Sequence, residues 1–180
     1  MLHGRAPPRA LRFTLDGMQP LTEDQIRESF VNTTRGEAER LPMPGLHEVL
    51  WDDREYLGWH DAKAPQRAYL TVWQDERPVS FALRASESRI RSGISAMCSL
   101  CHTAQPGAQV TLFAAPRSGD AGRKGDTVGT YICADLNCSA IIRIAPPAAP
   151  MQLPPEEIVQ RRITGLQERL GSFASTVLAG

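Results

Sequence analysis

Apolar residues near the start of the chain recur at helical spacing behind a polar cap. Thr22 stands three residues before Gln25, which is the spacing of a capping box, and acidic residues fill the first turn. Ile26 and Phe30 then share one face of a helix. We predict a helix from Thr22 to about Asn32, and the prolines of the following "RLPMPG" exclude a long second helix.

The middle of the chain shows the alternating pattern of strands. "AYLTVWQ" and "PVSFALR" are joined by a short "DER" turn, which predicts a hairpin over residues 69–73 and 79–83. "QVTLFAA" and "TVGTYIC" predict two more strands, separated by a glycine-rich segment that reads as a flexible loop. The later "SAIIRI" fits either a short helix or a strand. In the irregular, aromatic-rich stretch before the hairpin we favour a core role over an exposed patch for Trp51, Tyr56 and Trp59.

The last segment carries the clearest helical period. Its apolar residues recur at spacings of four and three: Val159, Ile163, Leu166, Leu170, Phe173 and Val177. Pro155 and the glutamates after it mark the start of the helix. The seam suits self-association through the helix, or packing across the hairpin. We favour packing, because a coiled coil normally needs more heptads.

These elements predict an α+β protein with a small N-terminal helix-plus-hairpin domain, a zinc finger and a C-terminal amphipathic helix. Residues 1–17 show no period and carry three arginines, which predicts a disordered tail or a misassigned start ahead of Met18. The predicted parts after that tail are a domain at 18–88, a finger at 89–145, a proline-rich linker at 146–155 and a helix at 156–180.

Composition narrows the class of protein. With 42% apolar and 22% charged residues and a formal net charge of zero, the chain of 180 residues reads as an ordinary globular protein. No apolar run is long enough for a membrane span or a signal peptide, so we expect the cytoplasm. Between residues 84 and 124, six basic residues face two acidic ones. This excess either balances charge near a metal or forms a docking surface, and both readings stay open.

Only four cysteines occur, in two close pairs: Cys98 with Cys101, and Cys133 with Cys138. In a reducing compartment this arrangement favours a metal over disulfides. Zinc takes four thiolates in a tetrahedron. A turn with two cysteines, a hairpin, and a second pair where a strand meets a helix is the layout of a treble-clef finger. We predict one structural Zn²⁺, with a rubredoxin-like iron site or unligated thiols as alternatives.

A metal held by four cysteines has no open position for water or substrate, which argues against catalysis. His102 follows the first pair, and we interpret it as a histidine beside the site and not as a ligand. His60 and Asp61 offer the one other arrangement with catalytic potential, and acidic loop residues are usually just solvated. We therefore predict a protein that is not an enzyme and has no small-molecule substrate.

The stretches "PLTEDQIRESFVNTTRGEAERLPMP", "WDDREYLGWHDAKAPQRAYL", "MCSLC" and "AGRKGDTVGTYICADLNCS" together resemble the FBP-domain family. These bacterial proteins have a C-terminal treble-clef zinc finger and are grouped with the elongation factor G-binding proteins of the FusB type. The resemblance covers residues 18–145. The family's resistance members have a larger helical N-terminal domain, so binding to the factor transfers to this chain better than resistance does.

The resemblance implies that the four cysteines hold zinc and that the finger grips elongation factor G, on or off the ribosome. It implies release of a factor that fusidic acid has locked there, or recycling of the factor, without modification of the drug. We predict the partner contacts at Met97, Arg123, Lys124, Tyr131 and Arg143, because positive and aromatic side chains are the usual anchors of such interfaces. The alternative is a finger that binds RNA or the ribosome through its basic residues.

Overall fold

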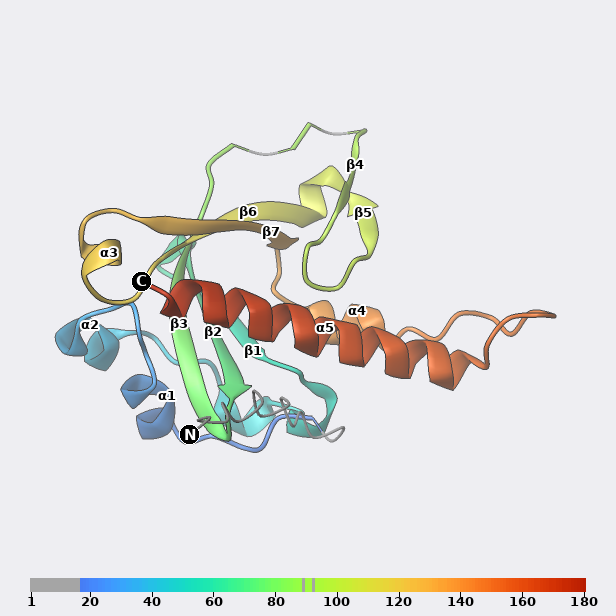
Figure 1. Ribbon diagram of the computed structural model, residues 1–180, viewed down its shortest axis with the longest axis horizontal. Coiled ribbons are helices and arrows are strands. Elements are labelled where there is room, and N and C mark those ends of the chain that lie inside the picture. Colours follow the sequence, from blue (N-terminus) through green and yellow to red (C-terminus); the bar gives the residue numbers. More distant parts are fainter. Residues whose placement is uncertain (1–16, 89, 92) are drawn as a thin grey trace, which may run out of the picture.

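The computed structural model describes residues 17–88, 90, 91 and 93–180. Apart from Gly17, the predicted disordered tail at residues 1–17 lies outside the described residues. A five-stranded sheet has one long helix across one face and two short helices on the other (Figure 1). A separate two-stranded sheet flanks the first cysteine pair.

The five-stranded sheet is antiparallel, in the order β1-β2-β3-β6-β7. Its strands are β1 (Leu57–Asp61), β2 (Ala64–Gln74), β3 (Arg77–Ala85), β6 (Val110–Pro116) and β7 (Thr127–Cys133). The small sheet pairs β4 (Ser95–Met97) with β5 (Ala104–Pro106). The helices are α1 (Glu23–Glu28), α2 (Arg35–Arg40), α3 (Gly119–Arg123), α4 (Cys138–Ile142) and α5 (Pro155–Leu178), with 3₁₀ turns at Leu46–Glu48, Trp51–Asp53 and Gly107–Gln109.

The first helix is capped as predicted but ends earlier. Thr22 and Gln25 form the capping box. The helix stops at Glu28 because the next residues leave it to bond with β3: Ser80 donates its N–H to the carbonyl of Ser29, and Val31 donates to the carbonyl of Ser80. The prediction of a helix to Asn32 was therefore wrong at its end, since a partner strand takes over these main-chain groups. A second capping box, between Thr34 and Glu37, starts the short α2.

The predicted hairpin is confirmed as β2 and β3, which pair from Arg67 with Arg84 to Gln74 with Arg77. Asp75 and Glu76 form the turn, both with positive φ, as the tightest hairpin turns require. The strand β1 was not predicted. It adds to the outer edge of β2, where a register shift follows His60.

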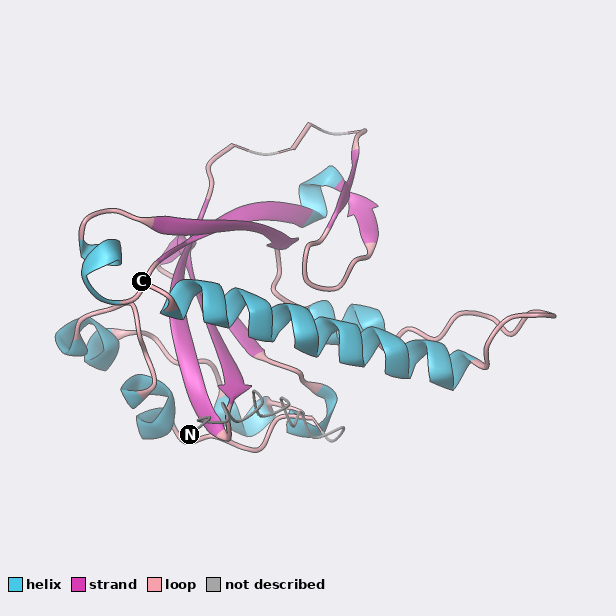
Figure 2. Cartoon of the chain, in the orientation of Figure 1, coloured by secondary structure: helices cyan, strands magenta, loops and turns pink. Residues whose placement is uncertain are grey.

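The strands β6 and β7 were predicted and pair along their whole length. β6 joins the end of β3 through the pairs Arg84 with Ala114 and Ala85 with Phe113. Figure 2 shows the consequence: β6 and β7 run across the direction of β2 and β3. Between β6 and β7 the structure has a helical turn, α3, where the sequence predicted a flexible loop. Gly122 permits this turn, because a Cβ there would collide with the carbonyl of Arg117.

Each face of the sheet has its own apolar core. On β2, Leu70 and Val72 face one core, which α5 covers, whereas Tyr69 faces the other. The rings of Phe81 and Phe173 pack edge to face in the first core, at 5.8 Å between centroids. The helix α5 is thus confirmed, and it packs across β2, as favoured over self-association.

The second core holds the N-terminal segment. Met18, Leu21, Ile26 and Trp59 are buried there, and Tyr56 is buried in the first core. Trp59 and Tyr56 are therefore core residues, as predicted from the sequence. Trp51 packs against the second core and is partly buried.

The first core draws residues from both sides of position 88, so the predicted boundary there stays a prediction. The segment after Cys138 is a helix, α4, which settles the choice left open by the sequence. Within the described part of the chain, no helix is both long and apolar enough to cross a membrane.

Candidate metal centre

The four cysteines meet in one buried cluster. Their Sγ atoms lie within 4.8 Å of one another, and each residue is at most 4% exposed. The sulfur atoms of Cys98 and Cys138 are 3.7 Å apart, and those of Cys101 and Cys133 are 3.6 Å apart. Four sulfurs at about 2.3 Å from a tetrahedral zinc would be about 3.8 Å apart. The cluster therefore fits an ion of that size and is a potential metal site.

The first pair sits on a tight turn between β4 and β5. The main-chain N–H groups of Leu100 and Cys101 both point at the Cys98 sulfur, at 3.4 Å. Such donors stabilise a thiolate, because they place positive partial charge beside it. His102 closes the turn with a positive φ, donates its N–H to the Cys98 carbonyl and is exposed. His102 is not among the four possible ligands, as predicted from the sequence.

The second pair sits where a strand meets a helix. Cys133 is the last residue of β7 and Cys138 the first of α4. Leu136 turns the chain between them: it has positive φ, is buried and donates its N–H to the Cys133 carbonyl. The predicted layout, with a strand ending at the third cysteine and a helical turn returning the fourth, is confirmed.

The four thiols influence one another's ionisation. Hydrogen bonding with Cys133 lowers the pKa of the Cys101 thiol, and hydrogen bonding with Cys101 raises the pKa of both Cys133 and Cys138. Once one thiol ionises, its neighbours are held protonated by the nearby negative charge. Only a bound cation would let all four sulfurs carry charge in this buried place.

Two side chains that the sequence did not suggest support the cluster. Tyr56, 1% exposed, accepts a hydrogen bond from the main-chain N–H of Cys138 at 3.3 Å. Burial, and after it the charge of Cys138, hold the pKa of this tyrosine well above its usual value, so it stays a neutral phenol. Gln105 donates its amide to the Cys133 sulfur at 3.2 Å. No short-range pattern marks either residue, since both act through the fold.

An ion pair with Glu55 also holds the end of α4, through Arg143 at its C-cap. The carboxylate of Glu55 is fully buried and lies 2.9 Å and 2.7 Å from two nitrogens of the Arg143 guanidinium. Ser139 accepts the N–H of Glu55 at 3.1 Å. The predicted contact of Arg143 with a partner stays a prediction, and its guanidinium is engaged inside the protein.

The other predicted contact residues lie at the two ends of β7. Met97 and Tyr131 are 60% and 45% exposed, and the turn that follows Met97 contacts β7 where Ser99 donates its N–H to the Tyr131 carbonyl. Arg123 and Lys124 are exposed at α3, the opposite end of β7. The fold therefore divides these four residues into an apolar pair and a basic pair.

The residues considered for catalysis have structural partners. Asp61 is buried, and its carboxylate accepts the N–H groups of Lys63 and Ala64, which shapes the turn into β2. The imidazole of His60 lies between the carbonyls of Pro65 and Ala134. Two concave regions lie elsewhere, a groove between the first cysteine turn and α5 and a hollow between α1 and α2. Neither His60 nor Asp61 lines them.

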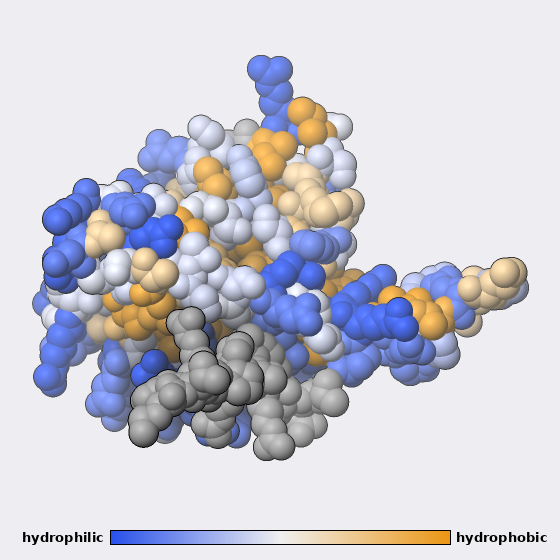
Figure 3. All heavy atoms as spheres, viewed as in Figure 1, coloured by the Kyte–Doolittle hydropathy of each residue, from blue (hydrophilic) through white to orange (hydrophobic). Residues whose placement is uncertain are grey.

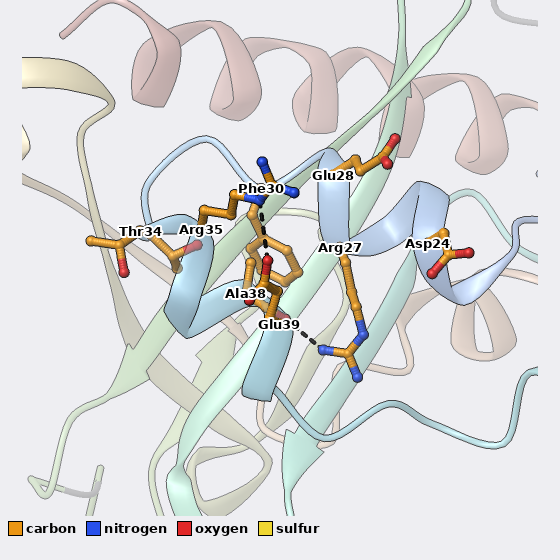
Figure 4. A pocket seen from close by; sticks show the side chains of 9 residues that line it. Asp24, Arg27, Glu28, Phe30, Thr34, Arg35, Ala38 and Glu39 are labelled. Carbon is orange, nitrogen blue, oxygen red and sulfur yellow. Dashed lines mark hydrogen bonds and ion pairs between the residues drawn. The ribbon is translucent and has the colours of Figure 1, made fainter.

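That hollow has a volume of about 540 Å³ and lies between the two short helices (Figure 4). Arg27 reaches across it to the carbonyl of Ala38, and Phe30 lies beneath. The two arginines of its lining pair with glutamates, Arg27 with Glu23 and Arg35 with Glu39. Both arginines at the hollow are thus engaged within the protein.

Comparison with known proteins agrees with this architecture. The model of the FBP C-terminal treble-clef zinc-finger family matches residues 25–177. Among solved structures, that of the fusidic acid resistance protein FusC superposes with a TM-score of 0.54 at 16% sequence identity. The match covers 87% of this chain and 58% of the FusC chain. At this identity the likeness shows the fold. The search of curated proteins found no match.

Proposed function

Because the chain belongs to the FBP C-terminal treble-clef zinc-finger family, we propose that it is a non-enzymatic protein that holds one structural Zn²⁺ and binds translation elongation factor G. The observation that carries this proposal is the closed cluster of four buried cysteines within a fold that matches the family. A cluster of this kind stabilises a fold and leaves the outer surface to bind a partner.

Cys98, Cys101, Cys133 and Cys138 would hold the zinc. The ion would cross-link the turn after β4, the end of β7 and the start of α4. In small fingers such a cross-link supplies about 10 to 16 kcal/mol of folding free energy. The metal-free protein should therefore lose the order of this region first.

The contact surface that we propose follows the exposed face of β7. Thr127, Gly129 and Tyr131 alternate with more buried residues and so point outward together. The basic pair of Arg123 and Lys124 stands at one end of this face and Met97 at the other. From Thr127 to Tyr131 the strand spans about 13 Å. A single interface of about 800 Å² per partner can cover both ends.

Binding would act on the factor by favouring one of its conformations. A ligand shifts such an equilibrium only by the difference between its affinities for the two states. We propose that the conformation favoured is one that leaves the ribosome, either after fusidic acid has trapped the factor or during recycling. The structural neighbour is described as a fusidic acid resistance protein, but this chain spans 58% of its length. Resistance therefore belongs to the proposal, as does the cytoplasmic location where the factor works.

The alternative of an RNA-binding finger has less support. Two arginines of the basic region are already paired, Arg117 with Asp126 and Arg123 with Asp120. Phosphate groups would have to compete with these acidic partners for the two cations.

The test is capture of purified elongation factor G by zinc-loaded protein, followed by calorimetric titration. We expect a complex at micromolar concentration or tighter, with a modest dependence on salt. The absence of a complex at that concentration would reject the proposal, and binding only to ribosomal RNA with a steep salt dependence would favour the alternative.

A further inference from the structure

A groove of about 880 Å³ opens between the first cysteine turn, the segment after α4 and the part of α5 from Ile158 to Arg169. One wall is the chain from Cys101 to Ala104, and the opposite wall comes from Ile158 and three arginines of α5. The segment 144–147 and Leu153 complete it. This volume is within the range of natural binding clefts, about 300 to 1,000 Å³.

The charged residues that line this groove are all arginines, although Arg161 also forms an ion pair with Glu157, which is not among the lining residues. Arg161, Arg162 and Arg169 line it, and no carboxylate is among the lining residues of the described chain. Arg162 donates one N–H to the carbonyl of Ile144 at 2.9 Å, and Arg169 donates one to the carbonyl of Leu100. Each guanidinium has five N–H donors. The main chain therefore positions these groups and leaves donors for an anionic ligand.

Apart from Cys101, His102 and Thr103, the remaining lining is aliphatic, and two of its side chains are open to solvent. Ile144 is 67% exposed and Leu153 is 37% exposed. Along α5 and the segment before it, hydrophobic and strongly hydrophilic surface lie next to each other (Figure 3). Exposed aliphatic side chains of this size, beside anchored arginines, are typical of a surface that a partner covers.

We propose that this groove binds an acidic peptide segment that carries aliphatic side chains, presented by a partner protein. Carboxylates of the segment would pair with Arg161 and Arg162, since the planar guanidinium matches a carboxylate through two parallel hydrogen bonds. An aliphatic side chain between them would pack against Ile144 and Leu153. This surface is separate from the outer face of β7, and the inference does not rest on elongation factor G.

RNA fits the groove less well than a peptide does. Sequence-tolerant binding of single strands relies on aromatic platforms on which bases stack. Among the described lining residues the one aromatic ring is the imidazole of His102, and the apolar lining consists of isoleucine, leucine, alanine and proline. A charge-complementary peptide can use both the cations and the aliphatic surface.

The experiment titrates zinc-loaded full-length protein into a fluorescein-labelled peptide that alternates glutamate with leucine, and follows fluorescence anisotropy. Arg161→Glu should weaken binding about tenfold, because it reverses one charge of the groove. Ile144→Ser should weaken it as well, by removing exposed apolar contact. Both side chains are largely exposed, so the fold should persist in each variant.

Arg35→Glu is the matched control, because Arg35 is also exposed and also pairs with a glutamate one helical turn away. It should bind like the wild type. Equal affinity of the wild type and Arg161→Glu would overturn the proposal. So would equal binding of a peptide with lysine in place of glutamate, or tighter binding of oligouridylate. The assay contains no elongation factor, so its failure is distinguishable from failure of the capture experiment.

Discussion

The hydroxyl of Tyr56 accepts the main-chain N–H of Cys138 across 3.3 Å, although 82 positions separate the two residues in the chain. The tyrosine belongs to the segment that leads into β1, and the cysteine is one of the four candidate ligands. The N-terminal half of the protein therefore holds the cysteine cluster directly. A destabilising substitution in either half should therefore also lower the stability of the other half.

Removing one sulfur tests the cluster. Cys133→Ser should lower the zinc content from about one ion per chain to near zero and unfold the region around the cysteines, because three thiolates bind zinc far more weakly than four. Mass spectrometry of bound metal and thermal unfolding measure both effects. Thr127→Ser, on the exposed face of the same strand, is the control. Unchanged zinc content in the cysteine variant would refute the assignment of Cys133 as a ligand.

Removing one hydroxyl tests the tyrosine contact. Tyr56→Phe should lower the free energy of unfolding by about 1 to 3 kcal/mol, because the buried N–H of Cys138 loses its acceptor. Tyr131→Phe makes the same chemical change on an exposed side chain and should stay within about 0.5 kcal/mol of the wild type. Denaturant unfolding of the zinc-loaded proteins compares them. Equal stability of the two variants would show that the hydroxyl of Tyr56 has no supporting role.

Breaking the buried ion pair should be more severe. Arg143→Ala leaves the carboxylate of Glu55 buried without its cation, which typically costs about 3 to 5 kcal/mol. Arg35→Ala breaks an exposed pair and should cost less than about 1 kcal/mol. Urea midpoints measure the difference. A small effect of Arg143→Ala, together with weaker binding of elongation factor G, would instead favour its role as a partner contact.

A single methyl group should disturb the loop between the last two cysteines. In Gly58→Ala the new Cβ would lie 2.7 Å from the Leu136 Cβ, inside van der Waals contact. Overpacking of this kind costs about 1 to 3 kcal/mol and should speed the transfer of zinc to a colorimetric chelator. In Gly129→Ala the nearest atom is 3.4 Å away, so zinc transfer should keep its rate. Identical rates for both variants would contradict a tight fit between β1 and this loop.

The basic pair is tested apart from the fold. Lys124→Ala should leave the unfolding curve unchanged and weaken the binding of elongation factor G about fivefold or more, because the side chain is exposed at the end of the proposed face. The other lysine of the chain, Lys63, is also exposed but lies at the turn between β1 and β2, and Lys63→Ala should bind normally. Calorimetric titration measures both. Wild-type affinity in the Lys124 variant would remove this residue from the interface.

The features predicted well from the sequence are those fixed by local chemistry. The two cysteine pairs indicated a cluster because few other arrangements explain four thiols at those spacings. Apolar residues alternate along β2 and β3 and recur with a helical period along α5, because these elements pack against the apolar cores on the two sides of the sheet. In each case neighbouring residues carry the whole signal.

The features that were missed depend on distant partners. The end of α1 is set by the main chain of β3, and β1 exists because the edge of β2 offers it hydrogen bonds. The pair of Arg143 with Glu55 has no local signal either, because 88 positions separate the two residues in the chain. Interactions of this kind become visible only when the tertiary fold brings the elements together.

The late position of α5 in the chain has a consequence for synthesis. Its apolar face covers β2 and β3, which are complete long before this helix is translated. At about 5 to 20 residues per second, synthesis from the end of β3 to the end of α5 takes about 5 to 20 seconds, during which that face of the sheet is uncovered. Truncation before Pro155 should therefore yield a product that associates with chaperones or aggregates, even though all four cysteines are present.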